Sequence, residues 1–173
     1  MTTTALIDAF RHHAWANARL LEVCAGLSDE QLATTVPGTY GSIIATLRHL
    51  VGADASYLEL LTDGAVPALG DDEEAGLDVG AMRRLVDEHA AAFERLATSD
   101  RDPSEDVVRQ REDGSSSHAP FGIRVAQILH HGTDHRSQVC TALTSLGIEP
   151  PEIDVWAYAD AEGRSWVEGE PTD

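Results

Sequence analysis

The chain has 173 residues, of which 42% are hydrophobic and 24% are charged. This length and composition are typical of one globular domain, here residues 1–173, and they exclude a disordered or fibrous protein. Twelve arginines and no lysine face 30 acidic residues, so the formal net charge is −18 at pH 7. A charge of this sign repels phosphate groups, which argues against nucleic acid or an anionic membrane surface as a partner.

A cytoplasmic location is predicted as well. The N-terminal stretch, MTTTALIDAFRHHAWANARLL, has no cationic segment followed by an apolar core and a cleavage site. No apolar run reaches the roughly 20 residues that a membrane-spanning helix needs. The two cysteines, Cys24 and Cys140, are too few for a disulfide framework, and we interpret them as small hydrophobic residues within helices.

A first helix is predicted over residues 5–25, because apolar residues recur there at helical spacing. These residues are Leu6, Phe10, Ala14, Leu21 and Cys24. Residues 28–31 have the pattern of a capping box that opens a short turn of helix before the breaker Pro37-Gly38.

A second helix is predicted over residues 42–61. One of its sides carries Ile43, Leu47, Val51 and Leu58, and the opposite side carries mainly small residues, so no side is clearly polar. A helix of this kind is usually buried on two sides. We therefore expect it near the centre of a helical bundle or at a subunit interface.

The remaining elements complete an all-α prediction. Residues 62–76, with an acidic run, are expected to form a surface loop, and Asp78 can cap a third helix over residues 79–98. Asp113-Gly114 favours a small hairpin or a tight loop within residues 105–121, and a fourth helix over residues 122–146 ends at Gly147. We predict a four-helix bundle, with this hairpin before the last helix, a docked C-terminal tail, and a cleft between the second and fourth helices.

Three of the eight histidines are candidates for a metal site. His131 and His135 are four residues apart in the fourth predicted helix, so both rings lie on one face, one turn apart. Two imidazoles in this arrangement can share one divalent ion. His49, on the small-residue side of the second helix, is the third candidate ligand.

Other polar residues have structural interpretations. Asn17 lies within the apolar stripe of the first helix and must find a hydrogen-bond partner, most simply as a clamp between helices. Asp54 lies about 140° around the helix from His49, so we interpret it as a buried polar link or a group behind the ligands. Arg124 and Gln138 share the face of the histidine pair and can line the mouth of the cleft or a solvated edge. The four histidines expected to be exposed or to point away from the site are His12, His89, His118 and His130.

Four segments resemble the DinB-like (damage-inducible) family of bacterial four-helix metalloproteins. They are WANARLL, GSIIATLRHLVGADASYL, HHGTDHRSQV and PPEIDVWAYADAEG. In that family, one histidine of the second helix and an H-x-x-x-H pair of the last bind a divalent metal. The resemblance implies these roles for His49, His131 and His135, and it implies a role in bacterial stress responses.

Three imidazoles with open positions are typical of a catalytic metal site, and they suit zinc best and nickel next. Relatives within the family include thiol-dependent transferases, which implies a thiol S-transferase that joins a low-molecular-weight thiol to a small electrophilic substrate. A metal-dependent hydrolase and a non-catalytic metal-binding module remain alternatives, and the spacing indicates no general base. Apolar surface left over around Trp15 and the second helix predicts a homodimer.

Overall fold

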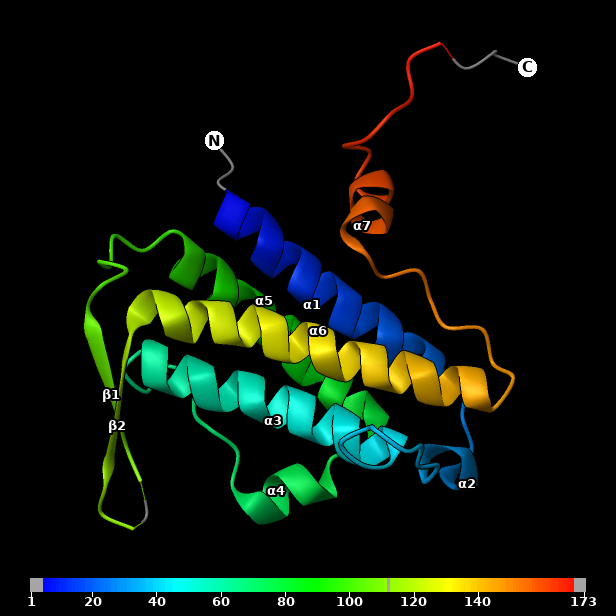
Figure 1. Cartoon of the computed structure of the whole chain (residues 1–173), viewed down its shortest axis with the longest axis horizontal. Helices are drawn as coiled ribbons and strands as arrows, with labels where there is room; N and C mark the ends of the chain where they lie inside the picture. The colour runs from blue at the N-terminus through cyan, green and yellow to red at the C-terminus, as the bar shows by residue number, and fades with distance from the viewer. Residues whose placement is uncertain (1–4, 112, 170–173) are drawn as a thin grey trace.

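The computed structural model describes residues 5–111 and 113–169. Within this part, the chain forms seven helices and one two-stranded hairpin, so the predicted all-α character with a small hairpin is confirmed. Four of the helices are long, and they pack so that each contacts two others (Figure 1). α1 and α3 both pack on α5 and on α6. The long helices are α1 (Ala5–Cys24), α3 (Ile43–Leu61), α5 (Val79–Ala97) and α6 (Phe121–Ser145).

The ends of these helices follow the capping residues in the sequence. The Ser42 side chain accepts a hydrogen bond from the Ala45 backbone N–H, and Asp78 accepts one from Ala81. Ser28 and Gln31 form the predicted capping box of the short helix α2 (Asp29–Leu32). After α6, Gly147 adopts a φ of +72°, a left-handed conformation that a glycine allows at a helix C-terminus. The predicted boundaries of the long helices therefore hold to within about one residue.

The segment over residues 62–76 differs from its prediction as a loop, because its second half forms the helix α4 (Asp71–Gly76). The Glu73 carboxylate accepts a hydrogen bond from the Gly70 backbone N–H, and acidic residues fill the first turn. Negative charge at a helix N-terminus is stabilised by the helix dipole. The acidic run therefore stabilises the start of a helix and is more than a solvated loop. α4 packs against α3 and so lies close to His49.

The hairpin pairs β1 (Asp106–Gln110) with β2 (Ser116–Pro120) in antiparallel register. Val107 is buried against the helices, and strand alternation directs Arg109 to the same side. Arg124 of α6 donates hydrogen bonds from Nη2 to the backbone carbonyls of Val107 and Ser117, at 3.3 and 2.9 Å. The hairpin is thereby attached to the first turn of α6.

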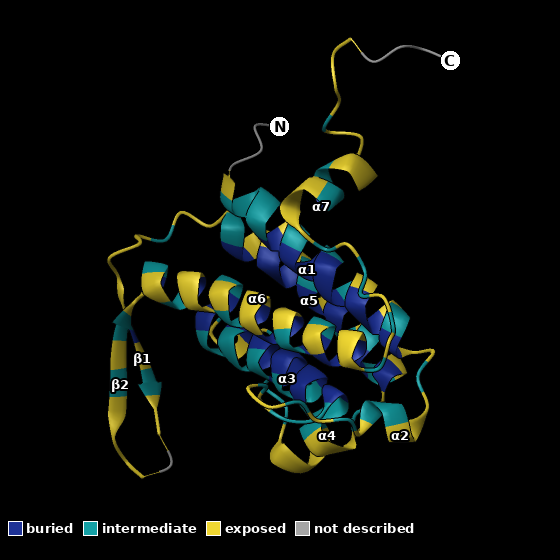
Figure 2. Cartoon of the chain, turned by 45° about the vertical axis from the view of Figure 1, so that its right-hand side comes forward, coloured by how far each residue is buried: buried dark blue, intermediate teal, exposed yellow. Residues whose placement is uncertain are grey.

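The C-terminal tail forms the short helix α7 (Val155–Ala161), which lies beside α1 (Figures 1 and 2). Tyr158 is buried, and its ring centroid is 5.6 Å from that of Trp15 and 5.9 Å from that of His12. The predicted docking of the tail is therefore confirmed. α7 covers part of the apolar surface around Trp15, which was one of the two reasons for expecting a homodimer. The homodimer therefore stays a prediction.

The interior has two apolar clusters with a polar layer between them. One cluster lies around Leu47 and Met82, and the other lies around Phe10 and Phe93. In every long helix, at least one buried polar residue lies between the residues that belong to one cluster and those that belong to the other. Five side chains of this layer are fully buried: His13, Asn17, Asp54, His89 and Arg136. None of the helices in the described ranges is long and apolar enough to cross a membrane.

Two of the histidines predicted to be exposed are not. His89 is only 3% exposed, because it occupies the inward stripe of α5 between Val86 and Phe93. His12 is half-buried, and its ring contacts the Ile153 carbonyl of the tail at 2.8 Å. His118 is exposed as predicted, and His130, which was expected to point away from His131, is exposed as well.

Candidate metal centre

His49 of α3 and His131 and His135 of α6 converge at the interface of these two helices. The Nε2 atom of His131 lies 3.1 Å from Nε2 of His49 and 3.1 Å from Nε2 of His135. One ligand atom from each ring lies within 4.8 Å of the other two. His135 is buried, and the other two histidines are half-buried. Of the histidines in the described chain, these three alone form such a group.

The spacing of these nitrogens fits one divalent ion. Zinc–imidazole bonds of about 2.0–2.1 Å place the nitrogens of a tetrahedral site roughly 3.3–3.4 Å apart. The observed separations of 3.1 Å are close to this value. The three histidines could therefore hold a metal ion, and imidazole donors suit zinc, nickel and copper better than magnesium or calcium.

Gln138 fixes the tautomer of His135. The Tyr40 backbone N–H donates a hydrogen bond to Gln138 Oε1 at 2.9 Å, which identifies this atom as an acceptor. Nδ1 of His135 lies 3.1 Å from the same oxygen, so it must carry the proton and donate. The Nε2 atom of His135 is then unprotonated and available to a metal. Of the two alternatives that the sequence left for Gln138, the structure places it beside the histidines, where it orients a ring.

Burial favours the neutral form of two imidazoles of the centre, His131 and His49. It lowers the pKa of His131 to about 4, with a smaller contribution from the neighbouring His135 and His49. Burial also lowers the pKa of His49, and His135 adds to this effect. Neutral imidazole is the form that binds metal, so near pH 7 protons compete only weakly for this site.

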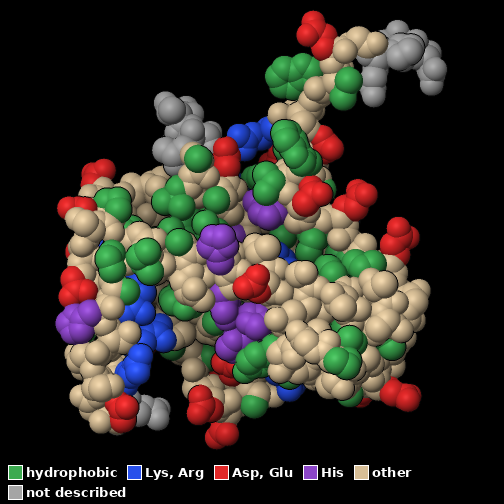
Figure 3. All heavy atoms as spheres, viewed as in Figure 1, with side chains coloured by type: hydrophobic (Ala, Val, Ile, Leu, Met, Phe, Trp, Pro, Cys, Tyr) green, Lys and Arg blue, Asp and Glu red, His purple; other side chains and the backbone are tan. Residues whose placement is uncertain are grey.

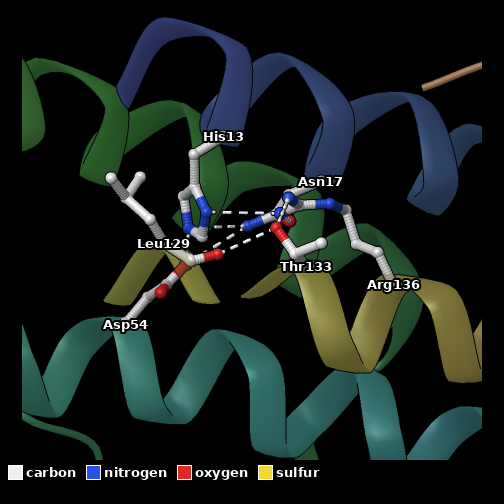
Figure 4. A network of polar contacts seen from close by, with 6 residues as sticks. All are labelled: His13, Asn17, Asp54, Leu129, Thr133 and Arg136. Carbon is white, nitrogen blue, oxygen red and sulfur yellow. Dashed lines mark hydrogen bonds and ion pairs between the residues drawn. The ribbon is translucent and has the colours of Figure 1, made fainter. Parts of the chain in front are cut away.

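A buried polar network supports the centre from the interior (Figure 4). The Asp54 carboxylate of α3 accepts hydrogen bonds from α1, with Oδ2 at 2.9 Å from His13 Nε2 and at 3.2 Å from Asn17 Nδ2. Arg136 of α6 donates from Nη1 to Asn17 Oδ1 at 2.8 Å. The expectation that Asn17 clamps helices together is confirmed, and Asp54 is the buried polar link that its position predicted.

Two atoms of this region have no hydrogen-bond partner among the described residues. They are Oδ1 of Asp54 and Nδ1 of His131, both buried. The negative charge of Asp54 opposes the lowering of the pKa of His131, which places the two groups within electrostatic reach of each other. A metal-binding histidine commonly directs its second nitrogen towards a carboxylate, and Asp54 is the acid available for that role.

Two cavities flank His49. One, of about 280 Å³, is lined by His49 and His131 together with Tyr57, Glu74 and Arg109. The other, of about 370 Å³, is lined by His49, Tyr40, Arg48, Asp71 and Glu74. Both give small molecules access to the histidines. Arg124, for which the sequence left the mouth of the cleft and a solvated edge as alternatives, lines neither cavity and instead binds the hairpin carbonyls.

Glu74 is an acidic group that sequence reasoning missed, since the segment around it was predicted to be a loop. Its carboxylate contacts the backbone of α3 at Gly52, in a space that a Cβ atom at position 52 would enter. Burial, and then the negative charge of Asp71, raises the pKa of Glu74. A carboxylate beside a candidate metal site can accept a proton from a bound molecule, and a raised pKa favours that role.

The cysteines take no part in the centre. Burial raises the pKa of Cys24 to about 12 and raises that of Cys140, so both remain thiols. Both cysteines are free. This agrees with their interpretation as small hydrophobic residues.

Comparison with known proteins supports the family resemblance. The sequence model described as the DinB family matches residues 1–171. A comparison with curated proteins found no match to the chain.

Proposed function

The chain belongs to the DinB family, and we propose that it is a divalent-metal enzyme of the thiol S-transferase type. The observation that carries this proposal is the convergence of three imidazole nitrogens beside cavities that small molecules can enter. Structural zinc sites are closed by four protein ligands, whereas catalytic sites keep an open position. We further infer that the four long helices form the four-helix bundle typical of this family.

His49, His131 and His135 would hold the metal, with zinc favoured over nickel by the donor set. A bound divalent ion would lower the pKa of a ligating thiol and hold it as the nucleophilic thiolate. Gln138 keeps the proton of His135 on Nδ1, so that Nε2 faces the site. Tyr40 stacks on His49, with ring centroids 4.1 Å apart, and limits the rotation of that ring.

The reaction forms a bond between the thiol sulfur and a carbon of the electrophile. The sulfur supplies the electron pair, and the leaving group departs with the pair of the bond that breaks. The thiol proton must be taken up first, and Glu74 lines both cavities at a suitable place to accept it. When the acceptor is a polarised double bond, the same carboxyl group returns the proton to carbon.

The test combines metal analysis with a thiol panel. The purified protein is analysed for metal and then assayed with an electrophilic chromogenic reporter, with and without thiol and chelator. The expected result is turnover that requires a thiol and is lost with the chelator. His131→Ala should abolish turnover and metal binding, while the adjacent exposed His130→Ala should keep both. Thiol-independent ester turnover would favour a hydrolase, and tight metal binding without turnover would favour a binding module.

A further inference from the structure

Arg109 has a backbone carbonyl and an aromatic ring as its partners. Five arginines in the described ranges form ion pairs with acidic side chains: Arg11, Arg19, Arg83, Arg101 and Arg164. Arg109 instead donates from Nη2 to the Ser56 backbone carbonyl at 3.1 Å, and its guanidinium lies 5.4 Å from the centre of the Tyr57 ring. No acidic side chain of the described part lies within ion-pair distance of it. Its guanidinium is therefore available to pair with a bound anion.

The fold places this charge beside the histidine centre. Arg109 lies on the helix-facing side of β1, and its side chain reaches α3 at Ser56, about two turns beyond His49. It lines the cavity of about 280 Å³ together with His49 and His131. Figure 3 shows histidine side chains at the surface in the middle of this face, with arginines between them and the hairpin. A guanidinium has five N–H donors, and the Ser56 carbonyl takes one of them.

A guanidinium that is held in place but lacks a counter-ion suits a planar anion, which can accept two parallel hydrogen bonds. Glu74 lines the same cavity and adds a negative charge when ionised. This charge would repel a dianion such as a phosphate monoester more strongly than a monoanion. A single carboxylate needs only the one guanidinium as its counter-ion. The cavity thus favours a small molecule with a single carboxylate.

We propose that Arg109 binds the carboxylate of a small organic acid that reacts at the histidine centre. This inference rests on the proposed function for the reaction, but the binding of the carboxylate can be measured without turnover. The carboxylate belongs either to the thiol or to the electrophile. Arg109 is thereby a residue that determines specificity, and it would orient the bound molecule relative to the three histidines.

The first measurement is ¹⁹F NMR of 4-fluorobenzoate and of 4-fluorobenzyl alcohol, each titrated with the metal-loaded protein. The two probes differ in charge and not in ring size. We expect 4-fluorobenzoate to bind more tightly than the alcohol, by about 10- to 100-fold, the range for a hydrogen bond to a charged group. Arg109→Gln should remove this preference. Arg111→Gln, an exposed arginine of the same hairpin, should retain it.

Glu74→Gln provides a second variant in the same cavity. It removes a negative charge, so it should strengthen 4-fluorobenzoate binding and leave the alcohol unchanged. Equal binding of the two probes to the wild type, or a preference that persists in Arg109→Gln, would overturn the inference.

A second measurement assigns the carboxylate. The cobalt-loaded protein is titrated with 3-mercaptopropionate and with 3-mercaptopropanol, and the thiolate–cobalt absorption band is followed. A preference for the acid that is lost in Arg109→Gln places the carboxylate on the thiol. Equal binding of the two thiols, together with a preference for 4-fluorobenzoate, places it on the electrophile. If neither thiol binds, the proposed transferase function is wrong, while the fluorobenzoate result still decides the role of Arg109.

Discussion

The ring of His13 in α1 occupies the space that a side chain at Gly132 of α6 would need. A Cβ atom built at position 132 would collide with Cε1 of His13 and would lie 2.7 Å from its Nδ1. The ring cannot simply move away, because Asp54 holds its Nε2 at 2.9 Å and Arg136 lies 3.2 Å from its Nδ1. Gly132 therefore allows α1 and α6 to approach closely at the level of the buried polar layer.

Gly132→Ala should consequently destabilise the protein. Alanine normally favours a helix interior by about 1 kcal/mol over glycine. Here the collision with a fixed ring should outweigh that gain, since overpacking of a core typically costs about 1–3 kcal/mol. Urea unfolding of the chelated protein measures the free energy of unfolding. Gly80→Ala, in the first turn of α5 where the nearest atom lies 3.4 Å away, is the matched control and should be neutral or stabilising. Equal effects of the two substitutions would contradict the close approach.

Gln138 should control the affinity of the centre for metal. Gln138→Leu removes the acceptor that holds the proton on Nδ1 of His135, so the unprotonated Nε2 is no longer fixed. Loss of such an outer hydrogen bond typically lowers metal affinity by about 10- to 100-fold. Competition with a chromophoric zinc chelator measures the Kd. Gln138→Glu, which keeps an acceptor, should retain affinity close to the wild type, and a Leu variant with unchanged affinity would show that the hydrogen bond is dispensable.

The sequence predicted the helices well because their signals are local. Ser42 and Asp78 cap the helices that they were expected to cap, and the spacing of His131 and His135 placed both on one face. The prediction that His89 is exposed was wrong, although its spacing from Val86 and Phe93 already placed it on the buried stripe of the helix. The spacing from Phe10 likewise indicated that His13 is buried.

Other parts of the site depend on contacts between segments far apart in the chain. Arg109 reaches the centre only because the hairpin folds against α3, and Tyr40 reaches it through the loop before α3. Glu74 was missed because an acidic run is also typical of a solvated loop. No spacing rule connects these three residues to His49, so the sequence could not predict the wall of the cavities.

Stability should fall in acid partly through His89. Burial lowers the pKa of His89, while the charges of Asp54 and Glu88 oppose this shift and that of His13 adds to it. In the unfolded chain, a histidine titrates near pH 6.5. The folded protein therefore binds fewer protons than the unfolded chain as the pH falls below about 6.5, and the free energy of unfolding decreases over that range. Above about pH 7.5, the group is neutral in both states and contributes no pH dependence.

The measurement is urea unfolding of the chelated protein at several pH values between 7.5 and 5. His89→Gln cannot titrate, so its free energy of unfolding should decline less steeply with falling pH than that of the wild type. The exposed His130→Gln serves as the control and should follow the wild-type slope. Parallel curves for the wild type and His89→Gln would show that His89 is not held neutral by the fold.

His49 can be tested as a ligand separately from its structural contacts. His49→Ala removes the stacking with Tyr40 as well as one imidazole, and the loss of stacking affects the protein with or without metal. The informative quantity is therefore the difference in Tm with and without excess chelator. A bound ion stabilises the folded state in proportion to the logarithm of its concentration over its Kd. The wild type and the exposed control His118→Ala should lose Tm with the chelator, and His49→Ala should not. Equal chelator sensitivity in all three proteins would mean that His131 and His135 bind the metal with another partner.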